Sequence, residues 1–292
     1  MIPVFALAAW ALAAPVPSSP APSPLPDCSP ARARVSTSAP TQGGVVLVEL
    51  ETEAGAREPA ARWQGKALPF WRDDPQGPWR ALAGIDLDQR PGDARVVVER
   101  GFERWCAVRL SVQAGTFEED HLTLPQKFVE LSPADQARAA REASQLAAVF
   151  RARGAERLWH GAFQIPIADG RRSSSFGRRR ILNGQPRSPH TGVDLGAASG
   201  TPVHAMQRGR VALDADLFFS GHTVVLDHGL GVFSLYGHLS ESRVHPDQVV
   251  DAGEVIGLVG ATGRVTAPHL HWAVRIGDAR VDGLDLVQLT PP

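Results

Sequence analysis

The sequence offers little that would direct the chain to nucleic acid or hold it across a membrane. Its 30 basic and 31 acidic residues leave a formal net charge of −1, whereas nucleic-acid-binding domains are typically strongly basic. Only two lysines occur, Lys66 and Lys127, and we interpret this bias toward arginine as an effect of genomic composition. No apolar run reaches the roughly 20 residues that a membrane-spanning helix needs. We therefore expect neither a nucleic-acid partner nor stable insertion into a membrane.

The first residues, "MIPVFALAAWALAAPVP", are apolar for about a dozen positions, the length of a signal-peptide core. Ala11 and Ala13 form an A-x-A site, so residues 1–13 are expected to be a signal peptide and the protein to be exported to the periplasm or cell envelope. No Lys or Arg precedes the apolar run, and an uncleaved apolar terminus is the alternative. The proline-rich residues 14–33 are typical of an extended tether.

Cysteine is scarce, with only Cys28 and Cys106 present. In an exported protein an even number of cysteines favours a disulfide. We expect these two to pair, which would attach the tether to the first domain. Two free thiols are the alternative.

The composition along the chain predicts a mostly β protein in three parts. Residues 34–128 alternate β-branched runs with turn signals, which favours an immunoglobulin-like β-sandwich acting as an accessory domain. Residues 129–160 are predicted to form a helical linker. Residues 161–292 are rich in glycine and short strand-like runs without helical periodicity, which predicts an antiparallel β-domain.

Capping residues and composition predict that the linker helix lies within "SPADQARAAREASQLAAVFRARG". Ser132 is a favourable N-cap, Pro133 suits the first helical position, and Asp135 suits the positive end of the helix dipole. Gly154 is expected to close the helix. The helix is predicted to lie against one or both domains through a modest apolar stripe that consists of Leu146, Val149 and Phe150.

Histidine is concentrated in the last part of the chain, where eight of the ten lie between His190 and His271. In "HTGVD", His190 and Asp194 share a face if the segment is extended, and in "HLH" His269 and His271 share a face of a strand. A third element, "LYGHL", places His238 on a strand. Two histidines and a carboxylate, with water in the fourth position, can form an open zinc site of the catalytic kind.

These motifs occur together, and in the right order, within a segment that resembles the catalytic domain of peptidase family M23. The resemblance covers residues 170–286 through "SSFGRR", "PHTGVDLGAASGTPVHAMQRGRV", "GHTVVLDHGLGVFSLYGHLS", "VVDAGEVIGLVGATGRVTAPHLHWAV" and "VDGLDL". It implies a zinc groove in which His190, Asp194 and His271 bind one Zn²⁺ per chain. It also implies that His238 and His269 stand beside the metal as catalytic residues, one activating water and the other stabilising the tetrahedral intermediate.

Other residues have weaker claims to the groove. Tyr236 would share a strand face with His238 and could donate to the oxyanion, although aromatic packing is an equal alternative. Asn183 could border the groove or cover the zinc. The remaining histidines of this segment are expected to be surface or turn residues; they are His204, His222, His228 and His245.

The resemblance implies a secreted zinc endopeptidase that hydrolyses amide bonds in peptidoglycan cross-link peptides. We favour the D-alanyl–diaminopimelate bond over glycine bridges. The alternative is a catalytically inactive M23-like protein that binds peptidoglycan and activates another cell-wall hydrolase. A restraint on the enzyme is also expected, either from an unknown regulatory protein or from the β-sandwich packing over the groove.

Overall fold

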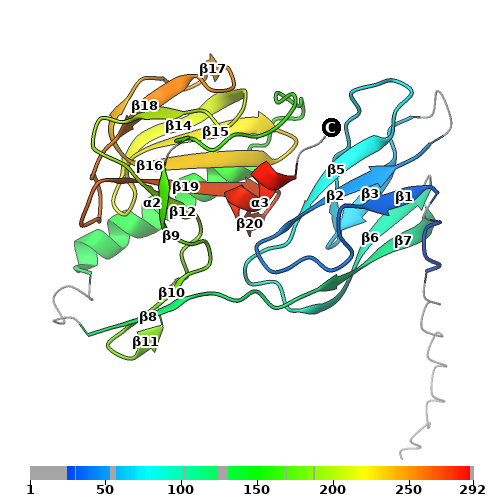
Figure 1. Ribbon diagram of the computed structural model, residues 1–292, viewed down its shortest axis with the longest axis horizontal. Helices are drawn as coiled ribbons and strands as arrows, with labels where there is room; N and C mark the ends of the chain where they lie inside the picture. Colours follow the sequence, from blue (N-terminus) through cyan, green and yellow to red (C-terminus); the bar gives the residue numbers. More distant parts are fainter. Residues whose placement is uncertain are drawn as a thin grey trace, which may run out of the picture.

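A computed structural model describes residues 25–29, 31–52, 57–100, 103–123, 131–168, 170–186 and 188–289. The predicted signal peptide and most of the tether lie outside these residues. The described chain forms two β-rich halves, a sandwich and a larger sheet domain, which lie side by side (Figure 1). In the described residues no helix is both long and apolar enough to cross a membrane.

The first half is a β-sandwich, as predicted. One sheet has the order β1-β2-β5 and the other β4-β3-β6-β7. Their strands are β1 (Ala33–Val35), β2 (Val45–Leu50), β3 (Ala60–Trp63), β4 (Lys66–Ala67), β5 (Trp79–Gly84), β6 (Gly92–Arg100) and β7 (Glu103–Val112). The predicted disulfide between Cys28 and Cys106 is present and attaches the start of the described chain to β7.

The linker contains helix α2 (Pro133–Arg151), which begins where the sequence predicted. The Ser132 hydroxyl accepts a hydrogen bond from the Asp135 amide at 3.1 Å. The predicted apolar stripe packs on the outer face of the large sheet, where the rings of Phe150 and Phe233 meet edge to face at 5.4 Å. The helix ends before Gly154, whose amide instead donates to Asp227 at 2.8 Å.

The second half is a ten-stranded sheet with the main order β17-β14-β15-β16-β19-β12-β9. The other three strands pair beside this path, β13 with β18, β18 with β16, and β20 with β19. The strands are β9 (Arg171–Ser174), β12 (Val193–Gly196), β13 (Pro202–His204), β14 (Gly209–Leu217), β15 (Gly221–Gly229), β16 (Val232–Ser242), β17 (Val249–Val250), β18 (Val255–Val259), β19 (His269–Ile276) and β20 (Ala279–Val281).

A small fourth sheet crosses the expected boundary between the halves. Strand β8 (Glu119–Leu122) pairs in parallel with β10 (Arg179–Leu182), which continues into β11 (Gln185–Pro186). The pairing joins residues before the helix to residues that follow it by about 30 positions, and local sequence patterns carry no signal for such a contact. This sheet lies at the lower edge of the molecule in Figure 1.

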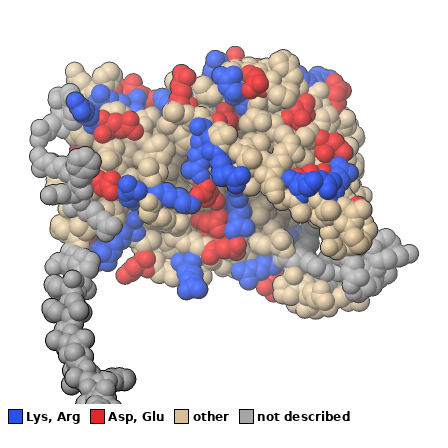
Figure 2. Space-filling model, turned by 180° about the vertical axis from the view of Figure 1, so that it is seen from behind, with Lys and Arg blue, Asp and Glu red and all other residues tan. Residues whose placement is uncertain are grey.

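The two halves also share a core and a charged seam. Trp71 of the sandwich packs edge to face on Trp159 at 5.4 Å, and one apolar cluster runs through both halves. Arg280 lies in β20 and donates to Asp86 at 2.6 Å and to Asp88 at 2.7 Å. Acidic and basic side chains alternate along this junction (Figure 2).

A short helix closes the chain, contrary to the expectation of a helix-free second half. Helix α3 (Gly283–Gln288) starts at Asp282, whose side chain accepts from the Leu284 amide at 2.9 Å. Asp285 in this helix accepts from the Val45 amide at 2.6 Å, so α3 also attaches the sandwich to the sheet domain. Six residues are too few for the hydrophobic period of a helix to be visible in the sequence.

Candidate metal centre

Strands β12 and β19 bring the candidate ligands together. They run antiparallel with Asp194 opposite His271 and Gly196 opposite His269. Side chains of directly opposed residues lie on the same face of a sheet and contact each other. The HxH spacing therefore places both histidines of β19 on the face that carries Asp194.

His190 reaches the same point from the loop before β12. Its backbone is fixed on both sides, because its carbonyl accepts from the Gly177 amide and its amide donates to the Arg178 carbonyl, each at 2.8 Å. The loop then passes close to β19 at Gly192, where a Cβ atom would lie 2.8 Å from Cε1 of His271. Glycine is the residue that permits this close approach.

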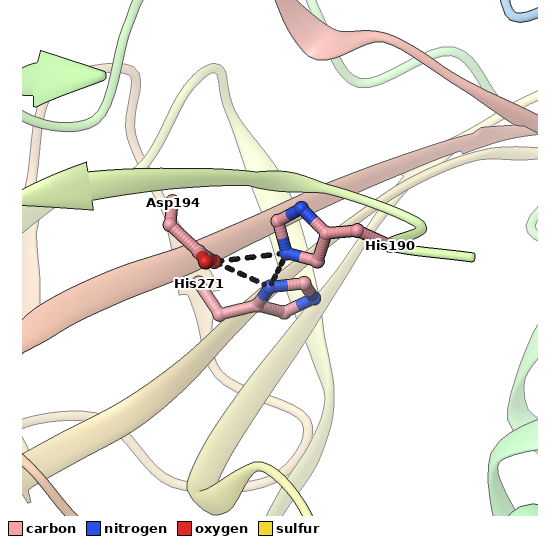
Figure 3. A group of neighbouring side chains, drawn as sticks. All are labelled: His190, Asp194 and His271. Atoms are coloured by element: carbon pink, nitrogen blue, oxygen red, sulfur yellow. Dashed lines mark hydrogen bonds and ion pairs between the residues drawn. The ribbon is translucent and has the colours of Figure 1, made fainter. Parts of the chain in front are cut away.

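The three side chains form a nearly equilateral triangle of potential ligand atoms (Figure 3). His190 Nε2 lies 2.9 Å from Asp194 Oδ1 and 2.9 Å from His271 Nδ1, and His271 Nδ1 lies 3.0 Å from Asp194 Oδ1. Asp194 is buried, while both histidines are only partly exposed. An ion above this triangle can reach all three atoms at the 2.0–2.2 Å typical of zinc with nitrogen and oxygen ligands.

The hydrogen bonds around the triangle favour a cation. His190 Nδ1 donates to the Ser175 carbonyl at 3.0 Å, so the neutral ring has no proton left for Nε2. Burial raises the pKa of Asp194, but the close contacts of its carboxylate with the rings of His190 and His271 outweigh this effect and lower that pKa well below its usual range. Burial also lowers the pKa of His271, which favours its neutral, metal-binding form. The residues present therefore fit a zinc ion.

Two further imidazoles stand beside the triangle, as predicted. The ring centroids of His238 and His269 are 4.8 Å apart, and His238 lies 5.9 Å from His271. His238 Nδ1 donates to the Thr262 carbonyl and His269 Nδ1 to the Ala267 carbonyl, each at 2.9 Å. With the proton on Nδ1, Nε2 is the acceptor nitrogen of each ring in its neutral form. Burial lowers the pKa of His238 to about 4, so this ring is neutral at pH 7.

His238 reaches the site because its backbone breaks the alternation of β16. Its φ is +65°, a left-handed conformation that is uncommon for residues other than glycine. The His238 amide donates to the Ser220 carbonyl at 2.6 Å, which holds the strand in this shape. The preceding residue, Gly237, pairs with His271. The left-handed turn thus places His238 on the side of the metal triangle rather than on that of Tyr236.

The structure corrects the interpretation of Tyr236 as a groove residue. Tyr236 is fully buried, and its hydroxyl accepts from the Met206 amide at 2.9 Å. The hydroxyl of Ser234 lies 2.9 Å from it and 2.8 Å from Nε2 of His228. Tyr236 therefore belongs to a polar network in the core, and burial raises the pKa of its hydroxyl.

The same network corrects the expectation that His228 is a surface or turn residue. His228 is completely buried, and its Nδ1 donates to the Arg208 carbonyl at 2.8 Å. Because the neutral ring has a single N–H, Nε2 accepts a hydrogen bond from the Ser234 hydroxyl. Burial lowers the pKa of His228 to about 4. His228 lies in β15, which carries none of the three potential ligands, and its role is structural.

Asn183 lies in the turn that joins β10 to β11, where it is exposed and has a φ of +52°. It therefore belongs to the small sheet and not to the strands that carry the metal triangle. The cavity beside His271 is lined by α2 and by strands of the large sheet, with no contribution from the described part of the sandwich. Helix α2 thus forms one wall of this cavity, and covering of the groove by the sandwich stays a prediction.

Comparisons with known proteins agree with this geometry. Residues 188–283 match the model of peptidase family M23, and residues 38–111 match that of the M23 N-terminal domain. A solved structure from Pseudomonas aeruginosa, described as a peptidase M23, is 35% identical, with a TM-score of 0.68 over 85% of this chain and 95% of its own. The chain belongs to peptidase family M23.

Curated relatives of this M23 chain match over less than half of its length. The DD-carboxypeptidase/endopeptidase Mpg of Neisseria meningitidis is 39% identical over 132 residues, which are 45% of this chain and 30% of the relative. The peptidoglycan DD-endopeptidase ShyA of Vibrio cholerae is 38% identical over 126 residues, 42% of this chain and 29% of the relative. The matched region thus spans less than a third of the length of these relatives.

Proposed function

We propose that this M23 chain is a zinc-dependent endopeptidase that hydrolyses amide bonds in peptidoglycan cross-link peptides. The observation that carries the proposal is the triangle of His190, Asp194 and His271 with two carbonyl-anchored imidazoles beside it. The name of the relative from Vibrio cholerae, a peptidoglycan DD-endopeptidase, supports peptidoglycan as the substrate, and the relative from Neisseria meningitidis is named a DD-carboxypeptidase/endopeptidase. Because both are named DD-peptidases, we propose the D-alanyl–diaminopimelate bond rather than a glycine bridge.

In this reaction the triangle would hold the metal, and the two imidazoles beside it would handle the proton and the developing charge. The zinc ion, when bound by the triangle, supplies a Lewis acid that polarises the amide carbonyl and lowers the pKa of water. His238 and His269 present Nε2 toward this point. One accepts the proton of the attacking water, and the other hydrogen-bonds the oxygen on which negative charge develops. The carbonyls of Thr262 and Ala267 fix both rings so that Nε2 keeps its direction during the reaction.

We also propose that the protein acts in the cell envelope, where its substrate lies. The signal-peptide pattern of residues 1–13 supports export. The disulfide between Cys28 and Cys106 is of the kind that forms in oxidising compartments. Fractionation of cells that produce the full chain, with detection in the periplasm, tests this assignment. Retention in the cytoplasm would contradict it.

Digestion of purified sacculi tests the proposed activity. The zinc-loaded full chain should convert cross-linked muropeptides into monomers that end in D-alanine, and a chelator should abolish the reaction. His269→Ala should keep the zinc but lose the cleavage. If the chain binds one zinc and the sacculi but leaves every cross-link intact, the alternative of an inactive activator takes the place of the enzyme.

A further inference from the structure

A cavity of about 310 Å³ extends from the metal triangle along the surface of the large sheet. Phe233 and Leu235 of β16 form part of its floor, and Leu146 and Phe150 of α2 form the opposite wall. His271 lies at its metal end. The cavity therefore continues the proposed cleavage site away from the metal.

Strand β19 runs along this cavity. His271, Ala273 and Arg275 alternate with buried residues and share one face of the strand, and all three line the cavity. Four residues of strand separate the backbones of His271 and Arg275 by about 13 Å. The small side chain of Ala273 leaves the space between them open. An extended peptide with its scissile bond at the metal would reach Arg275 about four residues away.

Arg275 is a half-buried cation without an anionic partner. Among the described residues it makes neither a hydrogen bond nor an ion pair, and its guanidinium lies over the Phe150 ring, 4.6 Å from the ring centroid. The charged residues nearby are already paired. Asp86 and Asp88 bind Arg280, and Asp278 binds Lys66 and Arg153.

This group of charges carries an excess of one positive charge, because four cations, counting Arg275, stand against three carboxylates. Of the group, Arg275 and Arg280 line the cavity itself. Burial lowers the pKa of Arg275, and the neighbouring Arg280 lowers it further, against the opposing effect of Asp86 and Asp278. An uncompensated half-buried guanidinium is unfavourable, and a carboxylate ligand would relieve it with charge-assisted hydrogen bonds.

We propose that Arg275 is a specificity-determining residue that binds a carboxylate of the peptide stem in the cleavage groove. The inference rests on the proposed function, because it takes the substrate to be a peptidoglycan peptide. Such peptides contain diaminopimelate and glutamate, whose carboxylates lie a few residues from the cross-link. The planar guanidinium suits a carboxylate because it can donate two parallel hydrogen bonds.

Two matched substrates test the proposal. One is a cross-linked muropeptide dimer with free stem carboxylates, and the other is the same dimer with these groups converted to primary amides. The zinc-loaded full chain should cleave the free form with a kcat/KM roughly tenfold to a hundredfold higher, the range expected for a hydrogen bond to a charged group. Arg275→Gln should cleave both forms equally, and Arg275→Lys should regain part of the preference.

Arg243→Gln is the matched control. Arg243 is an exposed arginine of the same domain that pairs with Glu241 at 3.4 Å, so this variant should keep the wild-type preference. The melting temperature of each variant separates a loss of recognition from a loss of folding. If Arg275→Gln still prefers the free form, or if the wild type cleaves both forms equally, the proposal is refuted.

A binding measurement separates this inference from the proposed function. Calorimetry with the zinc-loaded chain and an uncross-linked stem peptide needs no cleavage. The wild type should bind the free peptide more tightly than its amide, and Arg275→Gln should bind both alike. If no dimer is cleaved but this difference persists, the endopeptidase proposal fails while carboxylate recognition by Arg275 holds. If the wild type binds both peptides equally, Arg275 is not a carboxylate site.

Discussion

His228 should make the stability of this protein depend on pH through a group that lies away from the metal triangle. In the folded chain burial holds its pKa at about 4, whereas an unfolded histidine titrates near 6.5. As the pH falls from 6.5 to 4, the unfolded state gains a proton that the folded state does not accept. The free energy of unfolding therefore decreases across this window and is fully retained only above it.

The size of the effect follows from the difference in pKa. One pKa unit corresponds to about 1.4 kcal/mol, so the full window amounts to about 3 kcal/mol. Between pH 7.5 and pH 5, the part that is convenient to measure, His228 should contribute a loss of about 2 kcal/mol. His238 and His271 also have lowered pKa values, and they contribute in the same direction.

Urea unfolding of three metal-free proteins isolates this contribution. The wild type, His228→Gln and His245→Gln are compared at pH 7.5 and pH 5, with circular dichroism and tryptophan fluorescence as probes. His228→Gln should be less stable at pH 7.5, because it disturbs the contact with Ser234, but should lose about 2 kcal/mol less than the wild type on acidification. His245 is exposed, so its variant should follow the wild type. An undiminished pH dependence in His228→Gln would refute the argument.

Three other predictions concern the metal, the packing and the disulfide. Asp194→Asn should lose most of the bound zinc in elemental analysis, whereas His269→Ala should keep the zinc and lower kcat by about 10²–10⁴-fold. Gly229→Ala should destabilise the fold by about 2–5 kcal/mol in urea unfolding, because φ is +88° and the new Cβ would overlap the backbone oxygen of Glu156. Replacing Cys28 and Cys106 by serine should lower the stability of the sandwich by about 2–4 kcal/mol and its melting temperature accordingly.

Each of these predictions has a matched control. Gly200→Ala also places alanine at a positive φ, but nothing lies within 4 Å of its Cβ, so it should cost less than Gly229→Ala. Equal losses would show that close packing at Gly229 is not the cause. For the metal, zinc retained at full stoichiometry by Asp194→Asn would contradict the proposed ligand set. The wild type with its disulfide reduced and the serine variant should have the same melting temperature.

The sequence could predict the parts of the site that depend on local periodicity. The two-residue period of a strand places His269 and His271 on one face, and the order of the motifs identifies Asp194 as their partner. The start of α2 at Ser132 is equally local, because a cap needs only the residues of one helical turn. The structure places Asp194 opposite His271 and caps α2 with Ser132.

The remaining features depend on backbone shape or on distant contacts. Tyr236 and His238 are two residues apart, and a regular strand would place both on the same face. The left-handed backbone of His238 separates them, and no composition or spacing rule indicates it for a histidine. His228 resembles a turn residue until the core network of Ser234 and Tyr236 is seen. The parallel pairing of β8 with β10 also cannot be predicted from the sequence, because it joins segments that are distant along the chain.

That pairing links the two halves of the molecule at the metal. The Arg179 amide donates to the Glu118 carbonyl at 2.8 Å, and the adjacent residue, Arg178, holds the backbone of His190. A chain truncated to begin at Gly161 would lose β8 and, with it, the outer support of the loop that delivers the first metal ligand. We therefore expect that removing the N-terminal half weakens the binding of the metal, so that the two halves act as a single unit.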